Sequence, residues 1–515
     1  MIVKKSLLLA SPLLLLFACG IKDRNENIKI DYLGQQSPGS TAKEFAQGIV
    51  STDSFEHSSP VFSPNGDVVL WNILSRSRPD YLLEAIYENG KWSAPHRPSF
   101  GDSTADDYYP SFSTDGKTLY FSSRRQEPAG YVHRDMRIWK VERNGNKWGA
   151  PVPFDTTVSK SHEYSHSVTD KNTIYFSTSQ VGQTSWNIKK ASLADGTYSE
   201  AITLPFGINS VNYEDGAFIA PDERYLIFES QRAEGIDGSI DLYISFKLDD
   251  GRWSMPVNMG PAVNTGKTER MAKISPDGKY LFFGSNRNPK PGSWGFDIFW
   301  IETSAINALK DSSLARVAIE QPLGDNLLKA LEDGDNDRSA QLLKEWTAKY
   351  PGDMEGMRTY VGVLRRQKKY EEAEQVIASM PEEWMNSQMF KVDFAIIKFA
   401  LHKNDEAVAI IEPLLVPSEE LELRYWQIIN GLTDTGLYDF ADTYFEKLAA
   451  GGMHPVHIYN RACFYAKAGE KERAFRHLDQ AVDNGYNTIS QYENDTDLTS
   501  LKTDARWDKL RKKLK

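Results

Sequence analysis

The stretch Ile274–Ser285 reads ISPDGKYLFFGS and decides the fold of the first half of the chain. Pro276 presets φ for a turn and Gly278 tolerates positive φ, so the stretch predicts a strand, a tight turn and a second strand. Four similar stretches lie upstream, at Phe62–Trp71, Phe112–Phe121, Val168–Phe176 and Ile219–Phe228. Each carries Asn or Asp in the turn, at positions 65, 115, 170, 222 and 277, and a large aromatic residue six positions later. This period of 50 to 55 residues predicts a β-propeller.

Two further strands are expected in each repeat. The third often opens with aspartate, and the fourth reads aromatic-small-x-Pro, as in Trp92–Pro95. The fifth copy has no fourth strand after Trp300, so we expect the segment before the first copy, around Phe45–Thr52, to supply it and close the ring. Five motifs predict five blades over residues 44–303; a sixth, degenerate blade among the longer spacers stays an alternative.

The repeat resembles a known family. The order Ser-Pro-Asp-Gly-Lys, then Tyr-Leu-x-Phe-x-Ser, then Asp-Ile or Asp-Leu, is similar to the WD-like β-propeller repeat of the TolB type. The resemblance covers about half of the chain and implies the fold. It says little about function, because such propellers serve both as binding platforms and as enzyme domains.

The first nineteen residues read as an export signal. Lys4 and Lys5 precede the apolar run Leu7–Phe17, which is too short to span a bilayer. The run ends Ala-Cys-Gly at Cys19, which resembles the lipobox of bacterial lipoproteins and implies cleavage before Cys19 and acylation of that residue. An ordinary signal peptide with a chance cysteine is the alternative. Residues 20–43 are polar and predict a flexible linker.

The expected location follows from this signal. Several acyl chains would hold the protein stably on a membrane. Gly20 and Ile21 stand where an aspartate signals inner-membrane retention in some bacteria, so the outer membrane is favoured. The sequence leaves open whether the protein faces the periplasm or the cell surface.

Composition narrows the functional classes. The chain has 515 residues and a net charge of −11, which argues against nucleic acid as a partner. Two cysteines support neither a disulfide framework nor a metal cluster. Cys463 lies in an apolar helical pattern and is expected to be a buried free thiol.

Candidate binding residues recur in the propeller. An acidic residue stands seven to nine positions before each turn residue, and histidines adjoin two of them. The set is Glu56, His57, Asp107, His162, Glu163, Glu214 and Glu269. One interpretation is a ring of acids at a channel mouth that binds a cation or a basic ligand. The other is structural pairing, because Arg125, Arg232 and Arg287 recur four residues after the strand aromatic.

Recognisable catalytic motifs are absent from the sequence. It has no Gly-x-Ser-x-Gly elbow and no glycine-rich phosphate loop before a helix. His162 and His166 lie four residues apart, but on a predicted strand, where the helical zinc spacing does not apply. We therefore expect no catalytic residue, no metal and no cofactor. Paired carboxylates assembled from distant blades stay open.

A second repeat begins after the propeller. Residues 304–322 read as a connector, and alanines then recur every 33 or 34 residues, at Ala340, Ala373, Ala407, Ala441 and Ala474. Each lies in an amphipathic helical segment with an earlier helix before it. This pattern, over residues 323–515, resembles the tetratricopeptide repeat, with four to five copies and a closing cap near Asn494–Trp507. The resemblance implies a concave groove that binds partner proteins of the envelope.

These observations predict a lipid-anchored scaffold of the cell envelope without catalysis. The propeller and the helical repeats would each offer a surface for protein–protein interaction. The alternative is an envelope carbohydrate-binding protein, or a propeller enzyme that acts on a glycan or peptide at the channel mouth.

Overall fold

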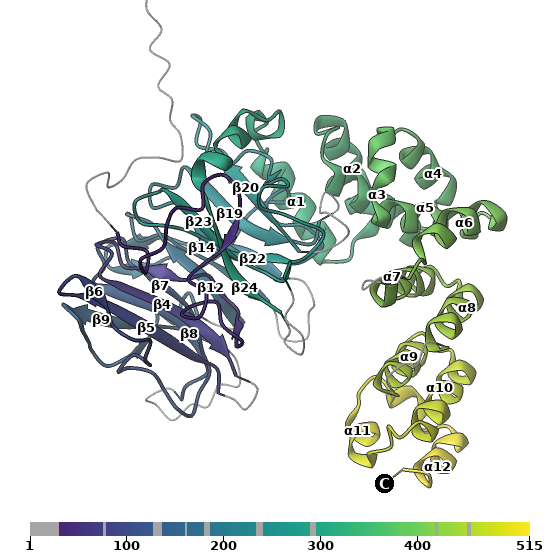
Figure 1. Ribbon diagram of the computed structural model, residues 1–515. Helices are drawn as coiled ribbons and strands as arrows, with labels where there is room; N and C mark the ends of the chain where they lie inside the picture. The colour runs from purple at the N-terminus through teal and green to yellow at the C-terminus, as the bar shows by residue number, and fades with distance from the viewer. Residues whose placement is uncertain are drawn as a thin grey trace, which may run out of the picture. The chain divides into compact units, whose positions relative to one another are not determined.

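The structure is a computed structural model that describes residues 30–75, 79–126, 136–159, 162–179, 186–232, 240–288, 295–417, 421–450 and 455–514. It contains five antiparallel sheets of four or five strands, each one blade of a β-propeller, followed by α-helices (Figure 1). The predicted fold class is therefore confirmed, with five blades. Cys19 lies outside the described residues.

The blades share one strand order, from the channel outward. The innermost strands are β2 (Phe55–Glu56) with β3 (Val61–Phe62), β7 (Asp107–Phe112), β12 (His162–Val168), β18 (Glu214–Ile219) and β22 (Glu269–Ile274). The second strands are β4 (Val68–Leu74), β8 (Thr118–Ser123), β13 (Ile174–Ser179), β19 (Tyr225–Ser230) and β23 (Tyr280–Ser285). The third strands are β5 (Tyr81–Glu88), β9 (Arg137–Asn144), β14 (Trp186–Ala191), β20 (Asp241–Phe246) and β24 (Asp297–Glu302).

Short strands complete each blade. They are β1 (Lys43–Glu44), β6 (Lys91–Trp92), β10 (Lys147–Trp148), β11 (Val152–Pro153), β17 (Ile202–Thr203) and β21 (Val257–Asn258), and β15 (Leu193–Ala194) and β16 (Thr197–Tyr198) form a separate hairpin. β1 pairs antiparallel with β24, with Lys43 opposite Trp300 and Glu44 opposite Phe299. The N-terminal segment thus supplies the outer strand of the fifth blade, as the sequence predicts.

The repeated turn stretch explains the blade geometry. Ser275 Oγ accepts a hydrogen bond from Tyr280 N (2.9 Å), and Gly278 adopts φ 72° beyond it. Ser113 and Gly116 repeat this arrangement in the second blade. The aromatics that follow are buried in the blade cores, with 0–1% exposure: Trp71, Phe121, Phe176, Phe228 and Phe283. A serine-capped turn and a buried ring therefore define each inner hairpin.

Twelve α-helices follow in the described part of the chain. They are α1 (Gln321–Glu332), α2 (Asn336–Lys349), α3 (Met354–Arg366), α4 (Tyr370–Ala378), α5 (Gln388–Ala400), α6 (Asn404–Ile411), α7 (Leu421–Asp434), α8 (Tyr438–Ala449), α9 (Pro455–Lys467), α10 (Lys471–Asp483), α11 (Ile489–Asn494) and α12 (Ala505–Arg511). Short 3-10 helices connect the propeller to α1 and recur later. None of the helices described is both long and apolar enough to cross a bilayer.

The chain divides into two compact units, one ending at Phe390 and one spanning Lys391–Lys515. In the first unit the early helices pack on the propeller. The rings of Trp346 and Phe206 meet edge to face with centroids 5.0 Å apart, and Asn212 Nδ2 donates to Glu355 (2.8 Å). In the second unit Ala407, Ala441 and Ala474 are fully buried in one apolar core, as their recurrence in helical segments predicts.

Closure of the ring makes a first prediction. Phe45 follows β1, is fully buried, and its ring packs against those of Phe282 (5.0 Å) and Trp300 (5.1 Å). Phe45→Ala should lower the free energy of unfolding by about 3–5 kcal/mol, because it leaves a cavity at the joint. Urea unfolding measures this. Ile49→Ala, at an exposed residue of the same segment, is the control. Equal stability of both variants would contradict a closure that depends on Phe45.

Candidate functional site

The five acids predicted to line the channel mouth are buried where the innermost strands begin, with 0–1% exposure. In four blades a Ser or Thr four residues earlier donates its hydroxyl to the carboxylate: Thr52 to Glu56, Ser159 to Glu163, Ser210 to Glu214 and Thr265 to Glu269. In the second blade Asp102 N donates to Asp107 (3.3 Å). These carboxylates thus fix the loop that enters each blade.

The recurring arginines complete these contacts. Arg125 Nη2 donates to both carboxylate oxygens of Asp107 at 2.7 Å. Arg232 and Arg287 lie 3.4 and 3.2 Å from the carboxylates of Glu214 and Glu269. The acids therefore face loops and arginines of their own blades.

A break in the innermost strands brings other side chains into the channel. The pairing register shifts two residues after the acid in β7, β12, β18 and β22, and the same interval separates β2 from β3. Tyr109 and Met271 take left-handed φ values of 51° and 52° there, which costs non-glycine residues energy. A bulge re-aims side chains. Here it brings Tyr109 and Met271 into one buried cluster.

An interrupted circle of aromatic side chains results, which we call the mouth ring. Its members come from all five blades: Phe55, His57, Tyr109, Tyr164, Trp186, Tyr213 and Phe296. Successive ring centroids, in the order Phe296, Phe55, His57, Tyr109, Tyr164, Trp186, Tyr213, are 5.4, 5.9, 5.6, 5.8, 4.4 and 6.1 Å apart.

Arg270 closes the circle. Its guanidinium lies 5.9 Å from the Phe296 ring centre, and Nη2 lies 3.4 Å from the Tyr213 hydroxyl. The outer members of the mouth ring keep part of their surface exposed: Phe55, Tyr164, Trp186, Tyr213 and Phe296. The mouth ring thus presents aromatic surface at the end of the channel where the innermost strands begin.

Two carboxylates lie beside Tyr213. Asp215 and Glu229 stand opposite each other in the β18–β19 ladder and are 2% and 0% exposed. The Tyr213 hydroxyl lies 2.8 Å from Asp215 Oδ2 and 3.0 Å from Glu229 Oε1. Arg270 Nη2 and Met271 N also donate to Glu229, at 3.2 and 2.7 Å. A Cβ at position 216 would lie 2.9 Å from Glu229 Oε2, so Gly216 makes room for the carboxylate.

This environment changes the protonation of the groups. Burial raises the pKa of the Glu229 carboxyl to about 7, against the attraction of Arg270, and the negative charge of Asp215 adds to the rise. Burial and Arg270 lower the pKa of His57 well below its usual range, so its imidazole is neutral. His57 Nδ1 and Arg270 Nε find no hydrogen-bond partner among the described residues. They are groups that a ligand can satisfy.

The sequence-predicted residues therefore fall into two groups. His57 belongs to the mouth ring, and His162 lies beside it, with its ring centroid 6.0 Å from that of Tyr164. Glu56, Asp107, Glu163, Glu214 and Glu269 face their own loops. Within the described ranges no group of three or more His, Cys, Asp or Glu residues is placed to hold a metal ion.

Sequence reasoning missed Tyr109, Tyr164, Trp186, Tyr213, Glu229 and Arg270. A comparison between blades carries the signal for Glu229. At its position, directly after the strand aromatic, the other blades have Asn72, Ser122, Ser177 and Gly284. A residue that departs from its repeat in charge is a candidate for function, since packing alone does not require it.

Comparisons with known proteins add the following. The sequence matches no protein-family model, and no curated protein is significantly similar to it. Solved structures similar to the chain include a puromycin-hydrolyzing peptidase of Mycobacterium tuberculosis, with 13% identity and a TM-score of 0.27 over 45% of this chain and 35% of that one. A prolyl endopeptidase has 19% identity and a TM-score of 0.25, over 45% of this chain and 32% of that one. An α-L-arabinofuranosidase of Fusarium graminearum has 10% identity and a TM-score of 0.31, over 46% and 73%.

The comparison corrects two predictions from the sequence. A scaffold without catalysis and the absence of enzyme activity are both contradicted, because peptidases and a glycosidase stand among the similar structures. The sequence misled because its motifs come from the propeller frame, which carries no catalytic signature. The chain spans about a third of the length of the first two peptidases, and no activity is transferred from them.

The carboxylate pair makes a second prediction. Between pH 4.5 and 7 native Glu229 binds more protons than the unfolded chain does, so the protein loses stability as the pH rises through this window. Glu229→Gln removes this titration. The stability of the natural protein relative to the variant should therefore fall by up to about 3 kcal/mol between pH 4.5 and 8.

Urea unfolding at several pH values measures the difference between the two proteins. Glu56, whose pKa burial also raises to about 7, titrates in both and cancels. Glu142→Gln, at an exposed residue, is the control. A difference that stays constant with pH would contradict the shifted protonation of Glu229.

Proposed function

We propose that the protein is a lipid-anchored protein of the bacterial cell envelope that binds a glycan at the mouth ring. The observation that carries the proposal is the ring itself, with partly exposed aromatic faces from several blades around one opening. Ligand sites are concave and mostly apolar, with a few polar groups that orient the ligand.

Sugar chemistry fits this arrangement better than peptide chemistry does. A pyranose presents apolar C–H faces and a rim of hydroxyl groups. Trp186 and Tyr164, whose rings meet edge to face 4.4 Å apart, offer surfaces for the first. Arg270 Nε and His57 Nδ1, which lack partners among the described residues, offer a donor and a further polar group for the second.

Hydrolysis of a glycosidic bond is the second candidate function. Two carboxyl groups are the usual catalytic equipment for it, one of them with a raised pKa so that it can donate a proton. Asp215 and Glu229 face each other across one strand ladder, and Glu229 is the carboxyl group with the raised pKa. Both are buried, so a sugar reaches them only after Tyr213 moves.

The surrounding assignments belong to the same proposal. Acylation of Cys19 anchors the protein, and the outer membrane is the favoured location. The TolB-type resemblance of the blades and the tetratricopeptide resemblance of the helices stay predictions, as does binding of other envelope proteins by the helical repeats.

Binding is tested with Trp186→Ala. The probes are a panel of gluco-, manno- and chito-oligosaccharides, with tripeptides of similar size, measured by isothermal titration calorimetry. The best oligosaccharide should bind the variant about tenfold more weakly, which corresponds to about 1.4 kcal/mol. Trp384→Ala is the control, at a partly buried tryptophan that follows α4. Preference for the tripeptides would overturn the ligand class, and unchanged affinity in Trp186→Ala would overturn the site.

Hydrolysis is tested on the oligosaccharide that binds best. Release of new reducing ends should stop in Glu229→Gln, while the affinity for the intact oligosaccharide stays within a few-fold of the natural protein. Reducing ends released equally by both proteins, or by neither, would exclude Glu229 as the proton donor.

Lipidation is tested by growth with an alkyne-labelled fatty acid. The natural protein should carry the label and sediment with membranes, and Cys19→Ser should lose both properties. Unlabelled natural protein would contradict the anchor and leave the glycan site unaffected.

A further inference from the structure

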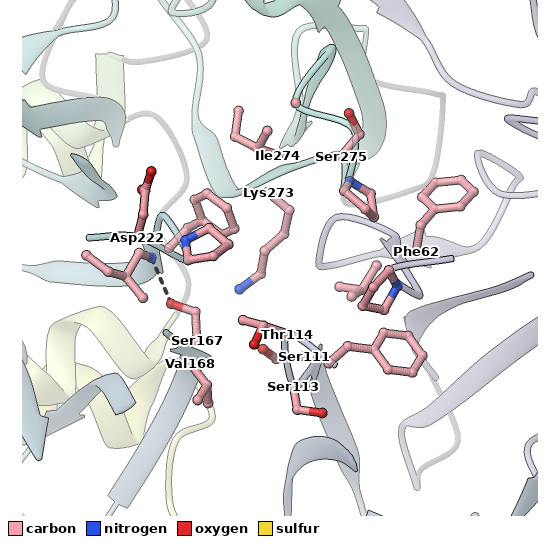
Figure 2. Close-up of a pocket in the computed structure, with 18 of the residues that line it drawn as sticks. Phe62, Ser111, Ser113, Thr114, Ser167, Val168, Asp222, Lys273, Ile274 and Ser275 are labelled. Atoms are coloured by element: carbon pink, nitrogen blue, oxygen red, sulfur yellow. Dashed lines mark hydrogen bonds between the residues drawn. The ribbon is translucent and has the colours of Figure 1, made fainter. Parts of the chain in front are cut away.

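A separate cavity of about 150 Å³ lies at the other end of the channel, where the innermost strands run into the turns (Figure 2). All five blades line it, through residues that include Pro60, Ser111, Ser167, Phe218 and Lys273. It shares no residue with the mouth ring. Its possible ligand is therefore a question independent of the proposed glycan site.

Lys273 is the group that gives this cavity a chemical character. It lies in β22 just after the register shift, and its side chain points to the middle of the cavity (Figure 2). Nζ donates to the backbone oxygen of His166 (3.3 Å) and lies 5.7 Å from the centre of the Phe218 ring. An ammonium group has three donors, and a hydrogen bond to one carbonyl leaves two for a ligand.

The remaining walls are apolar with a few hydroxyl groups. Phe112, Val168 and Ile274 supply apolar surface. The Ser167 hydroxyl is already used, since it donates to Ala217 O (3.1 Å) and accepts from Ile219 N (2.8 Å). An ammonium group amid such walls favours a ligand that pairs one negative charge with an apolar body.

The other charges near the cavity do not cancel this preference. Asp222 stands among the lining residues, but its carboxylate lies 3.3 Å from Arg224 Nε and faces outward solvent in part. Asp215 acts on Lys273 from the neighbouring strand β18. His166, on β12, has its pKa lowered to about 4 by burial and by Lys273, so its imidazole is neutral. The ammonium is the charge that meets a ligand inside the cavity.

We propose that this cavity binds a small organic carboxylate, with the carboxylate on Lys273 Nζ and its apolar body against Phe112, Val168 and Phe218. A carboxylate accepts charge-assisted hydrogen bonds, which are about twice as strong as neutral ones. The volume lies below that of typical drug-sized sites, so it suits a short acid or the last residue of a peptide.

Binding should depend on pH. Burial lowers the pKa of the Lys273 amine to about 8, while Asp215 opposes the shift. The ammonium form is required for the ion pair. Affinity should therefore be constant between pH 6 and 7 and fall as the pH rises through 8, by about tenfold per pH unit once the free amine loses its proton.

The test uses the natural protein and two pairs of probes, measured by calorimetry. 3-Phenylpropionate is compared with 3-phenylpropanamide, and a Gly-Gly-Phe tripeptide with a free carboxyl group is compared with its amide. Each acid should bind at least tenfold more tightly than its amide. The two acids distinguish a free acid from a peptide terminus as the source of the carboxylate.

Substitution locates the effect. Lys273→Met keeps the length of the side chain and should abolish the preference for the acids. Lys117→Met removes a mostly exposed lysine from the equivalent turn of the second blade and should leave it unchanged. Equal binding of acid and amide by the natural protein overturns the proposal even where the variant does not fold. So does a preference for acids that survives in Lys273→Met.

Discussion

Two residues of backbone hydrogen bonding hold the first and last blades together. Lys43 and Glu44 pair with Trp300 and Phe299, and Phe45 then enters the core between the two ends of the propeller. Without this pairing β24 would present an unpaired edge, which sheets otherwise cover or avoid. The positions of five innermost strands around one axis depend on a closed ring. Every site at the channel depends on them in turn, because each takes its residues from several blades.

The interruption of the innermost strands has the next largest consequence. Each blade needs its acid at the start of the strand to hold the entering loop, and its turn at the other end to make the hairpin. Two residues after the acid, the shift in register releases the strand from regular pairing. The side chains there differ between blades, from Tyr109 to Gly216 and Met271. A regular frame thereby holds an irregular set of groups.

The same division explains what the sequence predicts. The turn motif, the buried aromatic and the missing fourth strand are repeated or conspicuously absent, so five blades and their closure follow from pattern alone. The acids were found for the same reason, as repeated residues, and they contact their own loops. Tyr164, Trp186 and Glu229 are not repeated. They meet only because blades distant in sequence surround one axis, and no local pattern records that meeting. The two mouths differ likewise: Lys273 is one lysine among many until the fold places it at the centre of a cavity.

The central claim is that side chains from several blades form one glycan-binding opening around Trp186 and Tyr164. The most direct measurement is a crystal structure of the full chain with the oligosaccharide that binds most tightly. The account predicts electron density for a sugar ring against Trp186 and Tyr164, with a hydroxyl group within hydrogen-bond distance of Arg270. Density at the Lys273 cavity or on the helices instead, with the mouth ring empty, would contradict it.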